Sequence, residues 1–231
     1  MDTPFIDRIA AQAAETIEAA RKPALKPIPK PDVPPAVPRF DIYSGIHKGV
    51  RAFIDATMEK VGAMDAFDAD DVAETLAQAR GLLAFLQSHL EHENEFVHSA
   101  MRGKHPEETT RTMSDHVEHE HSINELSELA MEVELAPVNA RHAIAQRLYR
   151  QLALFAAENF EHMHVEETEN NAMLWASYTD PEILDIHNAI LKSLAPAEMA
   201  VGMRWMLPAL SHVERVGVLS AMRKDAPALS L

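Results

Sequence analysis

Two histidine–glutamate pairs are the residues of this chain best placed to do chemistry. His89 precedes Glu93 by four residues, and His162 precedes Glu166 by four residues. In a helix, residues four apart lie on one face, separated by about 6 Å along the axis. Both pairs fall on stripes that are otherwise apolar, where burying an imidazole or a carboxylate is costly without a partner. The two pairs therefore predict a polar site inside the protein.

The other histidines can be sorted by the face of the helix on which they fall. Of the 13 histidines, 11 lie between residues 47 and 164. His47 shares a stripe with Val50 and Ile54, so we expect it to face inward. On the third long segment the stripe passes through His119 first and His116 second. We expect Glu167 to point away from the core, and the following histidines to lie at the surface: His92, His98, His105, His121, His142 and His164.

Taken together, these inward groups indicate a metal site more strongly than any one of them does alone. A single inward histidine is commonly a core residue, and a single His-x-x-x-Glu pair is commonly a contact on a helix surface. Here each of four long segments contributes an inward histidine, and two of them add a carboxylate. Imidazole with carboxylate suits iron, with manganese and zinc as less favoured alternatives. Because one ion would not use so many ligands, we expect two ions, held by His47, His89, Glu93, His116, His119, His162 and Glu166.

The elements that must position these residues are predicted to be helices. Glycine is scarce (7 residues), and the chain is rich in alanine, leucine, methionine and glutamate, which favours an all-α fold. Helical periodicity predicts long helices over 41–61, 71–102, 107–135 and 138 to 173 or 175, with Asp71 and Glu74 capping the second. Short connections make neighbouring helices antiparallel, so we expect an up-down-up-down four-helix bundle over residues 40–175.

Two flanking regions lie outside the expected bundle. Residues 1–21 read as a short amphipathic helix, and residues 22–39 hold seven of the 14 prolines. This proline-rich segment is either a spacer or a strap that docks an acidic partner. Residues 176–231 predict three short helices over 180–194, 196–207 and 211–223. They would form a cap or an oligomerisation element, with a local core or a partner surface made by Met199, Met203, Trp205 and Met206.

Charge and composition exclude several classes of function. The net charge of −15 argues against binding to nucleic acids or to anionic membranes. The absence of cysteine excludes disulfides, iron–sulfur clusters and cysteine nucleophiles. No apolar run reaches membrane-spanning length, and the N-terminus lacks the hydrophobic region of a signal peptide. A cytoplasmic location is therefore the default expectation.

Four short motifs give the chain a resemblance to a known family. They are IHKGVR at 46–51, SHLEHENEF at 88–96, DHVEHEHSI at 115–123 and ENFEHMHVEE at 158–167. Together they make residues 40–175 resemble a hemerythrin-like domain, also called an HHE cation-binding domain. Each motif is unspecific by itself, and the resemblance depends on their combination.

The resemblance implies a non-haem di-iron centre with carboxylate and oxo or hydroxo bridges. Oxygen-carrying members have a His-x-x-x-His pair on the third helix and an aspartate five residues after the last histidine. This chain has His116-x-x-His119 and a glutamate four residues on, so it is more similar to the bacterial and iron-sensing branches. By motif position the terminal ligands would be His47, His89, His119 and His162, with Glu93 and Glu166 as bridges.

The expected function is to bind or react with a small ligand such as O2, NO or H2O2, for sensing, storage or detoxification. Tyr43 and Asn159 would either donate hydrogen bonds near the metals or simply pack in the core. One alternative is a regulatory or interaction protein with a structural or iron-sensing metal centre. Another is the repair of damaged iron centres. A homo-oligomer formed through the terminal helices is compatible with each of these functions.

Overall fold

Every secondary-structure element in the part of the chain that the structure describes is helical, which confirms the all-α prediction. The computed structural model describes residues 39–104 and 110–225. Its long helices are α2 (Ser44–Ala63), α3 (Ala69–His92), α5 (Thr110–Leu135) and α6 (Val138–Val165). A π-helical turn extends α3 into α4, and a second extends α6 into α7. These extensions are η1 (Glu93–Val97), α4 (His98–Lys104), η2 (Glu166–Asn170) and α7 (Asn171–Ser177).

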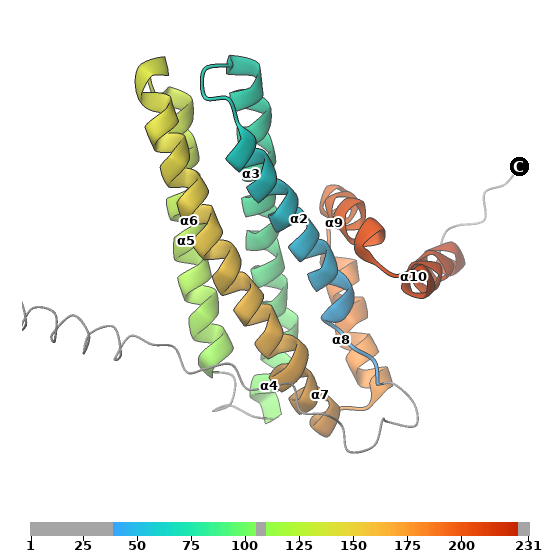
Figure 1. The fold of residues 1–231 in the computed structure, drawn as a ribbon. Helices are drawn as coiled ribbons and strands as arrows, with labels where there is room; N and C mark the ends of the chain where they lie inside the picture. The colour runs from blue at the N-terminus through green and yellow to red at the C-terminus, as the bar shows by residue number, and fades with distance from the viewer. Residues whose placement is uncertain (1–38, 105–109, 226–231) are drawn as a thin grey trace, which may run out of the picture. The chain divides into compact units, whose positions relative to one another are not determined.

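The four long helices pack so that each contacts two of the others. α2 contacts α3 and α6, and α5 contacts the same two helices (Figure 1). Their inward faces form an apolar core from residues of all four, because burying such stripes is the main favourable term in folding. Ile54, Leu76, Leu82, Leu126 and Ala130 are fully buried there.

The start of α3 differs from the expected one by a few residues. Asp68 is the N-cap, and its carboxylate accepts hydrogen bonds from the backbone N–H groups of Asp70 and Asp71. The prediction that Asp71 and Glu74 cap this helix was therefore wrong. The physical reason is that an N-cap side chain satisfies N–H groups two and three residues ahead, and Asp68 is the acceptor placed to do so.

Three short helices follow the long ones, as the tail sequence predicted. They are α8 (Asp180–Ser193), α9 (Pro196–Ala209) and α10 (His212–Asp225). The expected capping contact at α10 is present, since the Ser211 N–H donates to Glu214 and the Glu214 N–H to the Ser211 hydroxyl. α9 packs along α2, where the Trp205 ring stacks on Phe53 with centroids 4.1 Å apart. The tail therefore contacts a helix that is also expected to carry site residues.

A second, smaller apolar cluster lies beyond the main core, on the residues just before α2 and on η1, α4, α7 and α8. It comprises Ile42, Tyr43, Val97, Met101, Leu174 and Ile183. Along α2, His47 falls between Tyr43 of this cluster and Val50 of the main core. Along α3 and its extension, Glu93 likewise falls between Leu90 and Val97. The predicted polar residues thus occupy a layer between two apolar clusters.

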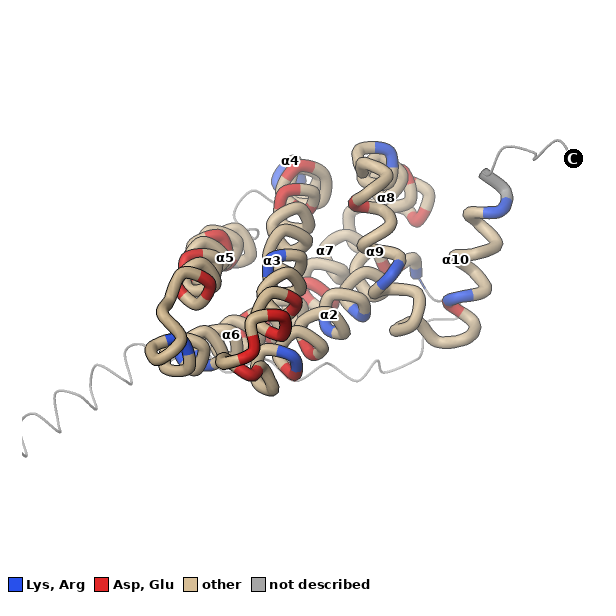
Figure 2. Tube along the Cα trace, turned by 90° about the horizontal axis from the view of Figure 1, so that it is seen from above, with Lys and Arg blue, Asp and Glu red and all other residues tan. Residues whose placement is uncertain are grey.

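Some predictions concern residues outside the described ranges. They are the N-terminal helix at 1–21, the proline-rich segment up to residue 38, the start of the third helix at 107 and the surface position of His105. No helix in the described ranges is both long enough and apolar enough to cross a membrane. Figure 2 shows acidic positions spread over several helices rather than collected on one, in keeping with the strongly negative net charge.

Candidate metal centre

Buried histidine and glutamate side chains from all four long segments converge in the polar layer. They form two groups, each with donor atoms within 4.8 Å of one another. The first group is His47, His89 and Glu93, and the second is Glu93, His116, His162 and Glu166. The structure therefore brings together six of the seven residues that the sequence singled out, and each group could hold a metal ion.

The first group joins α2 to the end of α3. The Nε2 atoms of His47 and His89 lie 3.4 Å and 3.3 Å from the same oxygen, Glu93 Oε1. His47 Nε2 is also 3.5 Å from Glu166 Oε2. The His47 side chain is fully buried and that of His89 is nearly so. Two imidazole nitrogens and carboxylate oxygens from three helical segments therefore face one small volume.

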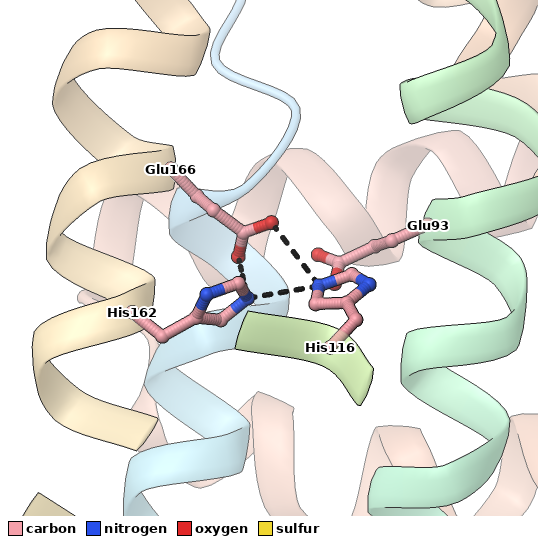
Figure 3. Close-up of side chains that lie close together, drawn as sticks. All are labelled: Glu93, His116, His162 and Glu166. Carbon is pink, nitrogen blue, oxygen red and sulfur yellow. Dashed lines mark hydrogen bonds and ion pairs between the residues drawn. The ribbon is translucent and has the colours of Figure 1, made fainter. Parts of the chain in front are cut away.

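The second group joins η1, α5, α6 and η2, and Figure 3 shows its side chains pointing toward one another. His116 Nε2 lies 2.9 Å from His162 Nε2 and 3.6 Å from Glu93 Oε2. Glu166 reaches both rings, with Oε2 at 3.3 Å from His162 Nε2 and Oε1 at 3.7 Å from His116 Nε2. All four residues are buried.

Glu93 belongs to both groups, and its two oxygens divide between them. Oε1 faces His47 and His89, whereas Oε2 faces His116. Around an ion held at about 2.1 Å, ligand atoms are about 3.0 Å apart in an octahedron and about 3.4 Å apart in a tetrahedron. The spacings of 2.9 to 3.7 Å between these donors are close to those edges. The donor sets therefore fit metal ions by both chemistry and spacing.

Unpartnered buried atoms give an independent test of that fit. Among the described residues, both oxygens of Glu166, Oε2 of Glu93 and both ring nitrogens of His98 have no hydrogen-bond partner. Leaving a buried polar atom without a partner costs about 1–3 kcal/mol, and more when it is charged. Their concentration in one layer is what a set of metal ligands requires, since a bound ion satisfies such atoms together.

The backbone explains how these side chains come to face one volume. In η1 the His98 N–H bonds to the Glu93 carbonyl, and in η2 the Asn171 N–H bonds to the Glu166 carbonyl. Each is a five-residue step in place of the four of an α-helix, so each turn holds one extra residue. The residue five positions after each glutamate therefore takes the face that the fourth would otherwise have taken.

Two predictions about the residues around these turns were wrong. His98 was expected at the surface, yet its side chain is fully buried, and its Nε2 lies 3.5 Å from Glu166 Oε1. Glu167 was expected to point away, yet it accepts a hydrogen bond from His47 Nδ1 at 3.2 Å and binds Arg51. His98 moved because the sequence projection assumed an unbroken α-helix. The position of Glu167 follows from packing against α2, which periodicity along one helix does not include.

Of the other histidines predicted at the surface, two are exposed and two are half-buried. The His121 side chain is 75% exposed and His142 is exposed, as expected. His92 and His164 are half-buried. The His92 Nδ1 bonds to the Ser88 backbone carbonyl of its own helix at 2.6 Å, so it does not face the site.

Three groups orient the inward rings from behind. Glu167 binds the Nδ1 of His47, and the Arg51 guanidinium holds that carboxylate through contacts of 2.6 and 3.0 Å. Asn94 Oδ1 lies 2.8 Å from His116 Nδ1, and Asp115 Oδ2 lies 3.5 Å from His162 Nδ1. A partner at Nδ1 leaves Nε2 to face the site, which is the usual arrangement behind metal-binding histidines. For His162 that partner is an ion-pair contact and not a hydrogen bond.

Charges in the layer are tightly coupled. Burial lowers the pKa of His47, but the hydrogen bonds to Glu167 and Glu93 outweigh it and raise the pKa to about 9. Burial likewise lowers the pKa of His162, but the charge of Glu166 and the contact with Asp115 raise it to about 10. Among the side chains alone, two imidazolium groups thus face the carboxylates of Glu93 and Glu166. The carboxylates of this layer therefore favour positive charge beside them.

His119, the first candidate on the third helix, lies outside both donor groups. It is buried, and its ring packs edge-on against His162 with centroids 4.9 Å apart. Its Nδ1 has no hydrogen-bond partner among the described residues. Burial and the charges of His162 and His116 lower its pKa to about 3, so the ring is neutral. The second candidate, His116, is the one that joins the donor group.

The two expected hydrogen-bond donors near the site behave differently. Asn159 is buried, but its amide donates to the Phe155 carbonyl of its own helix at 2.9 Å. Tyr43 is buried with its ring 5.3 Å from that of His47, and its hydroxyl lies 4.0 Å from the Met101 sulfur and close to the Asn170 side chain. Asn159 thus belongs to the helix, whereas Tyr43 keeps its hydroxyl near the site.

A weak signal for the shifted register is present in the sequence. An unbroken α-helix would continue the stripe of His89 and Glu93 through Phe96 and Ala100, but the structure buries Val97 and Met101, one residue later in each case. On α7 it buries Leu174, whereas an unbroken stripe from His162 and Glu166 would place Met173 inward. Apolar residues at both registers hide the shift, because either stripe reads as helical. Val97 and Met101 were the only hint that His98 would turn inward.

Comparison with models of known protein families and with curated proteins found no match to this chain. The assignment of the site therefore depends on its own geometry.

Proposed function

We propose that this chain is a hemerythrin-like, up-down-up-down four-helix bundle that binds two iron ions in its buried polar layer. The ions would serve to bind or react with a small ligand such as O2, NO or H2O2, for sensing, storage or detoxification. Iron is preferred because the donors are imidazole and carboxylate only, with manganese and zinc as alternatives. The cytoplasmic location expected from the sequence stays a prediction.

One observation carries the proposal: Glu93 is shared by two separate donor groups and offers a different oxygen to each. A carboxylate placed in this way suits a bridge between two cations. Glu166 supports the same assignment, because Oε2 faces His47 and His162 while Oε1 faces His116. A site for one ion would not require a second, distinct set of nitrogen donors on the far side of Glu93.

In this proposal the chain positions and orients the metal ligands and excludes water from the layer around them. His47 and His89 would hold one ion, and His116 and His162 the other, with both glutamates between them. The bound ions would supply an open coordination position for a small external ligand. The two apolar clusters on either side exclude water from the layer, which strengthens its electrostatic interactions. The Tyr43 hydroxyl, whose contact with the Met101 sulfur is long at 4.0 Å, would donate a hydrogen bond toward a bound ligand.

The proposal is tested by metal content in the purified protein. Protein loaded anaerobically with ferrous iron should hold about two iron ions per chain, and its visible spectrum should change on addition of O2, NO or H2O2. One zinc ion per chain, with no spectral response to any of these ligands, would contradict it.

The bridging role of Glu93 is tested separately. Glu93→Gln keeps the size of the side chain but removes the charge that both groups share, so it should lower occupancy at both positions. Glu95→Gln, an exposed neighbour in the same turn, is the matched control and should bind metal as the wild type does. Loss of metal in the control, or full retention in Glu93→Gln, would refute the shared carboxylate.

A regulatory function is the second candidate, because the tail touches the helix that carries His47. A Cβ atom on Gly49 would lie 2.9 Å from the Met206 Cα, so α9 packs directly on α2 two residues from His47. A metal centre that is structural or reports iron status could pass its occupancy to α9 through this contact. Trp205 fluorescence that changes on metal loading but not on ligand addition would favour this function over ligand binding.

A further inference from the structure

His98 is a fully buried histidine, and its contacts within the fold do not explain why a polar residue is buried there. Its side chain has no solvent exposure, and neither ring nitrogen has a hydrogen-bond partner among the described residues. Structural histidines in protein cores normally bond through at least one nitrogen, because an unpaired buried donor or acceptor is costly. Packing alone would be served at lower cost by an apolar side chain.

The environment of His98 is the second donor group. Its Nε2 lies 3.5 Å from Glu166 Oε1, the same oxygen that lies 3.7 Å from His116 Nε2. Its ring stacks on the His116 ring, with centroids 4.6 Å apart and planes 25° apart. His98 therefore extends the row of imidazoles formed by His116 and His162.

The two π-helical turns provide an internal comparison. Asn171 stands five residues after Glu166, as His98 stands five residues after Glu93. The Asn171 amide donates to Asp41 at 2.8 Å and to the Glu167 carbonyl at 3.3 Å, so it is occupied in holding the fold. His98 occupies the corresponding position without any such bond. The π-helical turn η1 therefore brings to the site an imidazole that makes no hydrogen bond within the fold.

We propose that His98 is a further metal ligand, which binds the ion held by His116, His162 and Glu166. This inference rests on the proposed function, because it requires an ion in the second donor group. It also makes the two ions unequal, since the second would have three histidines while the first has only His47 and His89. The extra residue of η1 is what supplies this ligand.

The test uses Co2+ as a probe in the full chain. Removing a ligand should lower the affinity for the ion at the second group by about 10- to 100-fold or more. That range is the usual effect of disturbing a residue that only supports a metal ligand. His98→Gln and His98→Ala should both show this loss in a Co2+ titration, while the first ion binds as in the wild type. The matched control is His92→Gln, because His92 is half-buried on the same helical segment and bonds to its own backbone.

A second measurement observes the metal contact of His98 in the wild type and uses a variant only to assign the resonance. In the Co2+-loaded wild type, each ligand histidine with a ring N–H gives a strongly shifted, exchangeable proton resonance. Selective 15N labelling of histidine should assign one of these resonances to His98 Nδ1–H, and it should be missing in His98→Gln. Wild-type protein in which the His98 resonances keep unshifted positions would overturn the proposal.

The outcomes separate this inference from the proposed function. If the wild type binds two ions and His98→Gln binds both with unchanged affinity, the His98 assignment is wrong and the two-metal site stands. If the wild type binds a single ion, the two-metal function fails, and the His98 resonance still shows whether His98 is a ligand. If the wild type binds no metal, both proposals fail.

Discussion

The pairing of His47 with Glu167 and Arg51 shows how single residues set the chemistry of this layer. Glu167 is held by the Arg51 guanidinium through both oxygens and in turn receives the Nδ1–H of His47. Burial raises the pKa of Glu167, but the contacts with His47 and Arg51 outweigh it and lower the pKa to about 2. Glu167 is therefore an anion at every relevant pH, and it keeps the His47 Nε2 directed at the site.

Glu167→Gln should weaken metal binding without removing a donor of either group. The amide oxygen can still accept the Nδ1–H, but it carries no charge, so the imidazole becomes a poorer donor. We expect the affinity of the ion near His47 to fall by about 10- to 100-fold, measured by Co2+ or Fe2+ titration. Glu158→Gln, an exposed carboxylate on α6, should leave the affinity unchanged. Equal affinities for the two variants would show that Glu167 does not support His47.

At the scale of elements, the packing of α9 against α2 depends on one glycine. Gly49 has no Cβ, and an added one would meet the backbone of Met206 at 2.9 Å, closer than real Cβ atoms approach. Backbone atoms cannot move aside as a flexible side chain can. The contact therefore ties the tail to α2 at a point beside His47.

Gly49→Ala should separate α9 from α2, although alanine is the better helix former. Overpacking of this kind costs about 1–3 kcal/mol, measured by urea unfolding. The fluorescence of Trp205, which stacks on Phe53, should change with it. Gly81→Ala is the matched control, because its Cβ would meet the Phe53 ring at an ordinary 3.7 Å. It should gain up to about 1 kcal/mol. A Gly49→Ala protein more stable than the wild type would show that α2 and α9 leave room for a methyl group at this contact.

At the scale of the whole molecule, the polar layer is a constraint on folding. Its donors come from α2, α3, α5 and α6, so their like charges must be balanced before these helices can pack together. Among the side chains alone, His47⁺ faces Glu93, Glu166 and Glu167, and His162⁺ faces Asp115, Glu166 and Glu93. Metal ions would take over this balance when they bind, because imidazole ligands must lose the proton on the coordinating nitrogen.

Protein prepared with a chelator should become less stable as the pH rises above neutrality. The pKa values of His47 and His162 are raised to about 9 and about 10, from about 6.5 in an unfolded chain. A raised pKa contributes stability that is complete below about pH 6.5 and is lost as the pH rises through the folded value. Because one pKa unit corresponds to about 1.4 kcal/mol, the loss amounts to several kcal/mol between about pH 6.5 and pH 10.

Thermal unfolding across this pH range measures the effect. Iron-loaded protein is the control and should show a much flatter profile, because its imidazoles carry no titrating proton on Nε2. Chelator-treated protein with constant or rising stability over the same range would mean that the two imidazolium groups do not balance the carboxylates.

The all-α class, the long helical segments and the three short tail helices could be predicted from the sequence. So could the inward positions of His47, His89, Glu93, His162 and Glu166. These features depend on local patterns: apolar periodicity, the scarcity of glycine and strong helix formers. Each is set within a few turns of one chain segment, and periodicity reports it directly.

The tertiary structure decided the rest, because it depends on contacts between helices and on a backbone step that periodicity does not record. The π-helical turn after Glu93 turned His98 inward, and packing on α2 brought Glu167 to His47. The choice of His116 over His119 on α5 was decided by the position of His162 across the layer. The sequence by itself determined that a buried histidine–glutamate layer exists, whereas tertiary packing determined which side chains complete it.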